Sequence, residues 1–241
     1  MVSLSLDHVQ WTVPALISLP KLQSLKFILC RVEGWENLCK SFNSLKNLSL
    51  RYVTSSGISA FPLPTRLETL EVRNCSDLND DGPEWLDKHC ESFPRLRKLM
   101  TDSISEETLI SILENSRCLE EFGYWTSGRI KLTAYHMAAI CRRAPPSLRS
   151  LSLYKGNYSE YDLENFIDHL PSSVTSLDLY RCRSLTPYLL SRLLELPALR
   201  ELSLTGIQDL SAKVQELEKV AKTQKPARLE KFDWEFIPYF F

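Results

Sequence analysis

One stretch decides how this chain folds: residues 67–82 read LETLEVRNCSDLNDDG. Its apolar residues Leu67, Leu70 and Val72 follow the spacing apolar-x-x-apolar-x-apolar. Side chains two apart on a β-strand point to the same face, so Leu70 and Val72 enter one core while Glu71 between them faces away. One strand of this kind cannot bury its apolar face alone, and the stretch therefore predicts neighbours of the same type.

The same spacing recurs along the whole chain, and successive starts lie 21 to 30 residues apart. Intervals of this size are typical of leucine-rich repeats, in which parallel strands stack into one sheet. The third place of one triplet holds Thr101 in place of an apolar residue. The triplets are Met1-Leu4-Leu6 (a truncated first unit), Leu22-Leu25-Phe27, Leu45-Leu48-Leu50, Leu67-Leu70-Val72, Leu96-Leu99-Thr101, Leu119-Phe122-Tyr124, Leu148-Leu151-Leu153, Val174-Leu177-Leu179, Leu199-Leu202-Leu204 and Leu229-Phe232-Trp234.

Between the strands, polar residues and prolines bracket segments with helical character. Acidic Glu106 and Glu107 open one such segment, and Pro187 occupies the first turn of another. We therefore expect an α/β leucine-rich-repeat solenoid of about ten repeats, with a curved parallel sheet inside and mostly helices outside. The expected helical segments are 84–92, 105–115, 134–143, 159–170, 186–196 and 211–223.

Length and composition agree with a single leucine-rich-repeat domain over residues 1–241. Apolar residues make up 44% of the chain and charged residues 24%, which supports a sizeable core. The chain ends in the aromatic sequence FDWEFIPYFF, and the end of a solenoid needs to be covered. We interpret residues 226–241 as a C-terminal cap. A contact for a partner and an apolar end left by truncation are the alternatives.

Two stretches resemble the cysteine-containing subtype of leucine-rich repeat: residues 67–82 and residues 174–186, which read VTSLDLYRCRSLT. This subtype is typical of F-box proteins with leucine-rich repeats and of their F-box-free relatives in mitotic-exit control. The resemblance covers nearly the whole chain and implies substrate recognition for an SCF-type ubiquitin ligase. No segment of the chain resembles the F-box itself, whose place is before the repeats. The resemblance therefore implies SCF components as partners if an F-box exists outside this chain.

Charge and motif content argue against several other functions. The formal net charge is -1, without the basic excess typical of nucleic-acid binding, and no apolar run has the length of a membrane span. The four histidines lack metal-ligand spacing, and the usual nucleophile, zinc and phosphate-loop motifs are missing. We expect no enzyme activity, no catalytic residues, no metal, no cofactor and no membrane partner.

Cysteine usage indicates a reducing compartment. The chain has seven cysteines, an odd number without CxxC spacing, and its first residues lack the pattern of a secretory signal. We therefore expect a cytoplasmic or nuclear protein. Cys30, Cys75 and Cys182 each follow the last core residue of a strand by three positions, where this repeat type turns inward. We expect these cysteines to be buried, reduced and structural.

The outward strand positions carry aromatic and basic residues where a solvated sheet usually carries Thr, Ser, Lys and Glu. Tyr, Trp and Arg are enriched at the hot spots of protein interfaces, although they also occur as ordinary β-formers on exposed sheets. Trp125 and Tyr154 fall on consecutive strands, about 5 Å apart, and are expected to form one aromatic platform. The candidate partner-binding residues are Arg51, Tyr52, Arg73, Asn74, Trp125, Tyr154, Lys155, Tyr180 and Arg181.

The leading hypothesis is a protein-binding module whose concave face holds a protein partner, with substrate recognition for an SCF-type ligase as its more specific form. The alternative is a standalone scaffold or inhibitor, such as an effector or a cell-cycle regulator, without a ligase link. A third hypothesis is a single-stranded nucleic-acid binder, because the same residue types can stack on bases. The interleaved acids Glu71, Asp102 and Asp178 argue against this third hypothesis.

Overall fold

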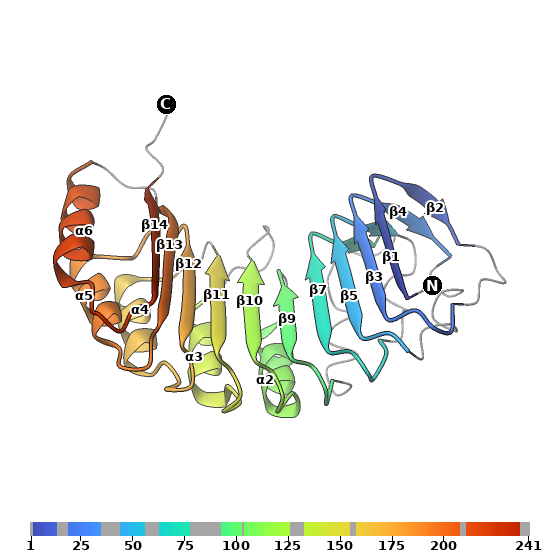
Figure 1. Cartoon of the computed structure of the whole chain (residues 1–241), viewed down its shortest axis with the longest axis horizontal. Helices are drawn as coiled ribbons and strands as arrows, with labels where there is room; N and C mark the ends of the chain where they lie inside the picture. Colours follow the sequence, from blue (N-terminus) through green and yellow to red (C-terminus); the bar gives the residue numbers. More distant parts are fainter. Residues whose placement is uncertain are drawn as a thin grey trace. The chain divides into compact units, whose positions relative to one another are not determined.

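The chain divides into two compact units, Met1–Leu119 (unit 1) and Glu120–Phe241 (unit 2). Each unit has its own series of parallel strands (Figure 1). The prediction of a single domain over residues 1–241 stays a prediction. The computed structural model describes residues 2–13, 19–34, 44–55, 63–77, 93–102, 104–125, 133–154, 158–207 and 211–236.

In unit 1, the predicted repeat strands pair in parallel in the order β1-β3-β5-β7-β9. The register aligns equal places of the repeat, because Leu25 lies beside Leu48 and Leu48 beside Leu70. The strands are β1 (Ser3–Asp7), β3 (Ser24–Ile28), β5 (Asn47–Arg51), β7 (Thr69–Arg73) and β9 (Lys98–Thr101).

Unit 1 also contains a second parallel sheet, in the order β2-β4-β6-β8, that the sequence analysis did not predict. The repeat pattern predicts one strand for each repeat, around its triplet, whereas each of the first four repeats has a second, short strand. After each repeat strand the chain turns, and the following residues pair with the next repeat: the Arg31 amide donates to the Val9 carbonyl at 3.1 Å. These strands are β2 (Gln10–Thr12), β4 (Arg31–Glu33), β6 (Thr54–Ser55) and β8 (Ser76–Asp77).

Unit 2 alternates strands with helices, and the helices lie along one side of the strands (Figure 1). All neighbouring strands are parallel, again with equal repeat places aligned. The strands are β10 (Glu121–Trp125), β11 (Ser150–Tyr154), β12 (Ser176–Tyr180), β13 (Glu201–Ile207) and β14 (Lys231–Phe236), and the helices are α3 (Ala134–Arg143), α4 (Glu160–Asp168), α5 (Pro187–Glu195) and α6 (Ser211–Gln224).

Helices α2 to α5 begin where the sequence predicts them, because Ser or Thr precedes each first turn. Ser105 accepts a hydrogen bond from the Thr108 amide at 3.2 Å and begins α2 (Glu106–Asn115). Ser159 and Asp162 exchange hydrogen bonds at the start of α4, so two orphan amides are satisfied. The predicted helix over 84–92 lies outside the described residues.

The core is the ladder of middle triplet residues that the sequence predicts. These residues are at most 1% exposed, and in unit 2 they face the apolar sides of the helices. In-register packing of parallel strands buries them against one another and removes them from water. The members are Leu48 and Leu70 in unit 1, and Leu151, Leu177 and Leu202 in unit 2. The fold is thus an α/β leucine-rich-repeat solenoid.

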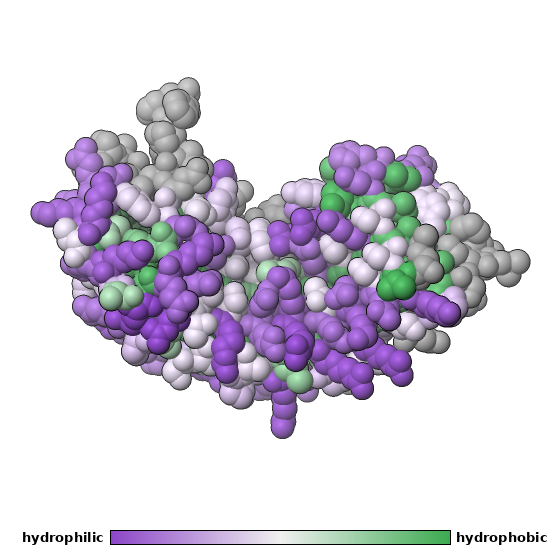
Figure 2. All heavy atoms as spheres, viewed as in Figure 1, coloured by the Kyte–Doolittle hydropathy of each residue, from purple (hydrophilic) through white to green (hydrophobic). Residues whose placement is uncertain are grey.

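The two ends of the chain have different features. Hydrophobic side chains gather over the N-terminal strands of unit 1 (Figure 2), where Val2, Val9 and Leu29 are exposed. At the other end, β14 shows that the predicted cap, residues 226–241, contributes the last strand of unit 2. The capping role of this segment stays a prediction, and residues 237–241 lie outside the described part of the chain.

Candidate functional site

Three aromatic side chains from consecutive strands of unit 2 stack on the strand face that points away from the buried core. We call this face the open face, and we call Trp125, Tyr154 and Tyr180 the aromatic ladder. The Trp125 and Tyr154 ring centroids are 4.1 Å apart with an interplanar angle of 20°. The Tyr154 and Tyr180 centroids are 5.2 Å apart with an angle of 37°. The ladder forms because the register places all three residues at the fifth position of their strands.

A carboxylate lies beside the aromatic ladder, at the third position of β12. The Tyr154 hydroxyl donates a hydrogen bond to Oδ2 of Asp178 at 2.7 Å. The other oxygen, Oδ1, is buried and has no hydrogen-bond partner among the described residues. Across the strands, the neighbours of Asp178 are Ser152 and Ser203, both small.

At one end of the aromatic ladder, Tyr180 lies close to Arg181 and Gly206. The guanidinium carbon of Arg181 lies 5.3 Å from the centroid of the Tyr180 ring. Gly206 has φ +66°, and a Cβ atom there would come within 2.9 Å of both Arg181 Cγ and a ring carbon of Tyr180. Gly206 also marks a register shift between β13 and β14, so its freedom at positive φ serves a β-bulge.

In unit 1, the open face carries a cluster of charges built around Glu71. Its Oε2 accepts hydrogen bonds from Arg51 Nη2 and from Ser49 Oγ, each at 2.8 Å. Its Oε1 lies 2.7 Å from Arg73 Nε. We call Ser49, Arg51, Glu71 and Arg73 the Glu71 cluster. Two predicted partner-binding residues, Arg51 and Arg73, are thus already paired within the chain.

The Glu71 carboxylate is stabilised in its ionised form despite its burial. Burial raises the pKa of Glu71, but hydrogen bonds from Arg51 and Ser49 and the positive charges of Arg73 and Arg51 lower it by more. The net pKa therefore lies below its ordinary value of 4.5. An ionised acid held by two guanidinium groups stabilises this unit from within.

Two acids that the sequence analysis placed on an exposed face are instead buried. Glu71 is 7% exposed and Asp102 is 4% exposed. The long arginine side chains of the same and the adjacent strand lie against Glu71, and the carboxylate of Asp102 accepts the backbone amide of Asn74. Alternation along a strand predicts only the direction of a side chain. It does not predict whether neighbouring side chains cover that side chain.

The candidate residues Tyr52, Asn74 and Arg181 occupy one recurrent backbone position, directly after the repeat strand. All three have left-handed φ angles, between 51° and 55°, as do His8 and Leu29. The amide of Tyr52 donates to the Arg73 carbonyl at 2.8 Å, so the turn is held by the next strand. Tyr52 and Asn74 are exposed, and Arg181 is half-buried. Lys155, the remaining candidate, lies outside the described residues.

Of the three cysteines predicted to be buried, two are. Cys182 is 1% exposed and accepts a hydrogen bond from the Tyr158 hydroxyl at 3.4 Å. Cys30 is 2% exposed and its thiol donates to the Ile28 carbonyl at 3.1 Å. Cys75 as a whole residue is half-buried, which corrects the prediction, although burial of its thiol raises the pKa to about 12. The described cysteines, including Cys118 and Cys141, are free thiols.

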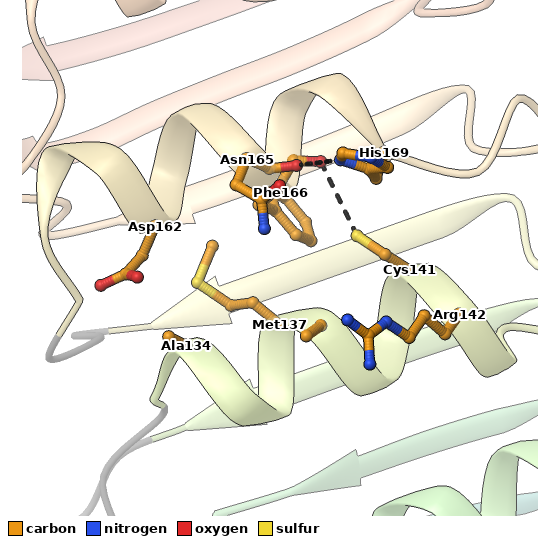
Figure 3. A pocket seen from close by; sticks show the side chains of 9 residues that line it. Ala134, Met137, Cys141, Arg142, Asp162, Asn165, Phe166 and His169 are labelled. Carbon is orange, nitrogen blue, oxygen red and sulfur yellow. Dashed lines mark hydrogen bonds between the residues drawn. The ribbon is translucent and has the colours of Figure 1, made fainter.

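A small cavity of about 220 Å³ lies on the helical side of unit 2, between α3 and α4 (Figure 3). Met137 and Cys141 line it from α3, Phe166 lines it from α4, and His169 lines it from the position directly after α4. The Cys141 thiol donates to the Phe166 carbonyl at 3.7 Å, and burial raises its pKa to about 12. Such a thiol is protonated at neutral pH and is a poor nucleophile.

The sequence analysis did not identify a row of exposed tyrosines on the helices of unit 2. Tyr135, Tyr161 and Tyr188 are the second residues of α3, α4 and α5, and they are 70%, 75% and 52% exposed. The sequence pattern that could have identified these tyrosines is Ser/Thr-x-Tyr, which occurs at the start of three successive helices. Tyr188 donates a hydrogen bond to Glu164 at 2.8 Å, which ties α5 to α4.

The described part of the chain contains neither a candidate metal site nor a candidate membrane span. No group of three or more His, Cys, Asp or Glu side chains there is placed to hold a metal ion. None of its helices combines the length and the apolar character that crossing a bilayer requires.

Neither a family model nor a curated protein matches the sequence. Among solved structures, an internalin from Listeria monocytogenes is similar, with 11% sequence identity and a TM-score of 0.49. The match covers 92% of this chain, and the chain spans 64% of the length of that structure. The fold assignment rests on the repeat spacing and strand register of the chain itself.

Proposed function

We propose that this chain is a protein-binding leucine-rich-repeat module and that the open face of unit 2 holds the partner. The aromatic ladder carries this proposal. Trp125, Tyr154 and Tyr180 are half-buried, so part of each ring remains available for contact. Tyr and Trp provide large contact areas at low cost in conformational entropy, and stacking already restricts these three.

Unit 1 is the weaker candidate for the same role. Its guanidinium groups Arg51 and Arg73 have Glu71 as a partner at 2.8 and 2.7 Å. A ligand carboxylate would have to displace that internal carboxylate, which lies largely out of solvent. Leaving the buried Glu71 carboxylate without its partners is unfavourable, so these arginines are better suited to holding the sheet together than to capturing a partner.

A protein partner fits the aromatic ladder better than a nucleic acid does. Tyr154 lies between Trp125 and Tyr180, so both faces of its ring are covered. A base stacks on a free aromatic face, whereas this ladder presents mainly ring edges. Asp178 next to the ladder also repels phosphate groups.

The more specific hypothesis is substrate recognition for an SCF-type ubiquitin ligase. Its support is the cysteine pattern around Cys75 and Cys182, which carries the resemblance to F-box proteins with leucine-rich repeats. The alternative is a standalone scaffold or inhibitor. Copurification of the ligase adaptor subunit with the tagged product of the complete gene would favour the ligase hypothesis. Recovery of a partner without the adaptor would favour the scaffold.

The binding proposal is tested by affinity purification with three forms of the chain: wild type, Trp125→Ala and Tyr161→Ala. Tyr161 provides a matched control, because it is an exposed aromatic residue on the helical side of the same unit. We expect Trp125→Ala to lose the partner and Tyr161→Ala to retain it. The reverse result would place the partner on the helices and overturn the proposal.

A further inference from the structure

The cavity between α3 and α4, which we call the α3–α4 cavity, has room for an apolar side chain. Its volume is about 220 Å³. An apolar cavity of about 150 Å³ is large enough to admit benzene. Met137 and Phe166 line the cavity and are each 1% exposed, which places them at its base. Ala134 and Ala138 line it from α3 and are half-buried, so they remain within reach of a ligand.

The thiol of Cys141 adds an uncharged wall to the α3–α4 cavity. It donates a hydrogen bond to the Phe166 carbonyl at 3.7 Å. Burial raises the pKa of this thiol to about 12, so it stays protonated at neutral pH. A protonated thiol behaves as a small apolar group. The middle of the cavity therefore suits an apolar group better than a charged one.

One end of the α3–α4 cavity carries an unpaired cation. Arg142, in the last turn of α3, lines this end and is exposed. Its guanidinium has no hydrogen bond or ion pair with any residue that the structure describes. Its positive charge lies close enough to Cys141 to oppose the rise in the pKa of that thiol. A guanidinium group without a partner beside an apolar cavity favours a carboxylate as its ligand.

The acids of α4, across the cavity, already have partners within the chain. Asp162 accepts a hydrogen bond from the Ser159 amide at 2.8 Å and so caps its own helix. The other acids of α4 are bound by side chains at the start and along the length of α5: Glu160, Glu164 and Asp168. These acids are therefore satisfied internally, and a ligand carboxylate would not have to compete with them for the guanidinium across the cavity.

His169 provides a second polar group at the same end of the cavity. Figure 3 shows Cys141 between the side chains of His169 and Arg142. The Nδ1 atom of His169 lies 2.8 Å from the Asn165 carbonyl oxygen. A carbonyl oxygen only accepts, so Nδ1 carries the proton and Nε2 of the neutral ring is an acceptor. This end of the cavity thus offers donors for a carboxylate and an acceptor for an N–H group.

We propose that the α3–α4 cavity binds the C-terminal residue of a peptide or protein. The side chain of that residue enters the cavity, its carboxylate pairs with Arg142, and its amide N–H donates to Nε2 of His169. A C-terminal residue carries all three groups on one Cα atom. An internal Asp or Glu carries its charge at the tip of the side chain, which would then have to enter the apolar part. The site lies on the helical side, separate from the open face, so it goes beyond the proposed function.

The direct test uses the whole chain and a defined probe. Amide spectra of the 15N-labelled protein are recorded during titration with a hexapeptide of Gly and Ser that ends in Leu with a free carboxylate. We expect saturable shifts at Ala138, Cys141 and Phe166. Arg142→Gln should weaken binding at least about tenfold, because a charge-assisted hydrogen bond is lost. The matched control Arg143→Gln removes a neighbouring charge that does not line the cavity, and it should weaken binding much less.

Three further peptides identify what the cavity binds. The same peptide with a C-terminal amide loses the charge, and a peptide that ends in Gly loses the side chain, so both should bind at least about tenfold more weakly. An amidated peptide with an internal Glu beside Leu provides the carboxylate from a side chain. Equal binding of either amidated peptide, unchanged binding by Arg142→Gln, or no saturable shifts with the Leu peptide would overturn the inference.

Two variants separate this inference from the proposed function. Ala138→Phe fills the cavity from a half-buried position, and it should abolish peptide binding while the folded amide spectrum is retained. Trp125→Ala, on the open face, should bind the peptide like the wild type. Loss of peptide binding in Trp125→Ala, or full binding by Ala138→Phe, would overturn the assignment to the cavity. Loss of the open-face partner in Trp125→Ala supports the proposed function whatever the peptides show.

Discussion

Units 1 and 2 place different side chains at the same position of the repeat. The fifth strand position holds Arg51 in β5 and Arg73 in β7 of unit 1, and the aromatic ladder in β10, β11 and β12 of unit 2. The arginines of unit 1 are paired with buried Glu71, whereas the rings of unit 2 contact one another and leave their edges exposed. Position in a repeat therefore fixes the direction of a side chain, while its neighbours on adjacent strands decide whether it remains available for a partner.

The two units also differ behind the sheet. The first three repeats are 21 to 23 residues long, and short parallel strands follow their repeat strands. The repeats of unit 2 are 25 to 30 residues long and contain helices of nine to fourteen residues. Repeat length alone does not decide between short strands and helices, because the fourth repeat is 29 residues long and contains β8, whereas the fifth is 23 residues long and contains α2. Both solutions leave the register of the open face unchanged.

The largest effects are expected in the buried ladder, where the two units should respond alike. Leu70→Ala in unit 1 and Leu177→Ala in unit 2 each remove a side chain that is at most 1% exposed. Each should lower the free energy of unfolding by about 2–5 kcal/mol. Chemical denaturation measures this loss. A loss below about 1 kcal/mol in either variant would mean that the face assigned to the core of that unit is wrong.

Binding should distinguish the units where stability does not. Trp125→Ala or Tyr154→Ala should lower the free energy of partner binding by about 2 kcal/mol or more, as for other hot-spot aromatics. Tyr52→Ala in unit 1 should change it by less than about 1 kcal/mol. Calorimetric titration with the recovered partner provides the values.

Two controls belong to this comparison. Circular dichroism should show that the ladder variants remain folded, and Tyr161→Ala on α4 should bind like the wild type. A large loss of binding on Tyr52→Ala, with the ladder variants unaffected, would assign the partner to unit 1.

The fold was predictable from the sequence, and the candidate site was only partly so. Trp125 and Tyr154 each directly follow one of two consecutive triplets, so their stacking follows from register alone. The burial of Glu71 could not be predicted, because it depends on the conformations of two long arginine side chains. The left-handed turn at Tyr52 and Arg181 could not be predicted either, since bulky residues rarely adopt positive φ. There the stacked repeats impose a conformation that the local sequence does not favour.

The Glu71 cluster should make the stability of unit 1 depend on pH. Because the folded-state pKa of Glu71 is lowered, its ionised form stabilises the native state above the ordinary value of 4.5. This contribution is lost as the pH falls below 4.5 and through the folded-state pKa. Glu71→Gln should lower the free energy of unfolding at neutral pH by about 1–3 kcal/mol, and the difference from wild type should shrink in acid.

The matched control is Glu68→Gln, which removes an acid from an exposed pair with Lys46 at 3.0 Å. An exposed ion pair contributes at most about 1 kcal/mol, so this variant should unfold nearly like the wild type. Denaturation at several pH values checks both variants. If the cost of Glu71→Gln were independent of pH down to strongly acidic conditions, the carboxylate would not be the source of the stabilisation.

The smallest expected effect compares one backbone position between the units. Gly206, inside β13 of unit 2, and Tyr52, directly after β5 of unit 1, occupy the same place of the repeat, and both have positive φ, 66° and 54°. Gly206→Ala should lower the free energy of unfolding by about 1–2 kcal/mol, because alanine is strained in the left-handed region. Its Cβ would also come within 2.9 Å of the Tyr180 ring, so the near-ultraviolet circular dichroism of the aromatic ladder should change. Tyr52→Gly relieves the same strain at a side chain that is 54% exposed, and it should leave stability unchanged or raise it by up to about 1 kcal/mol. If Gly206→Ala were neutral, the bulge would tolerate a side chain. The backbone of β13 would then not pack closely against Tyr180 at the end of the aromatic ladder.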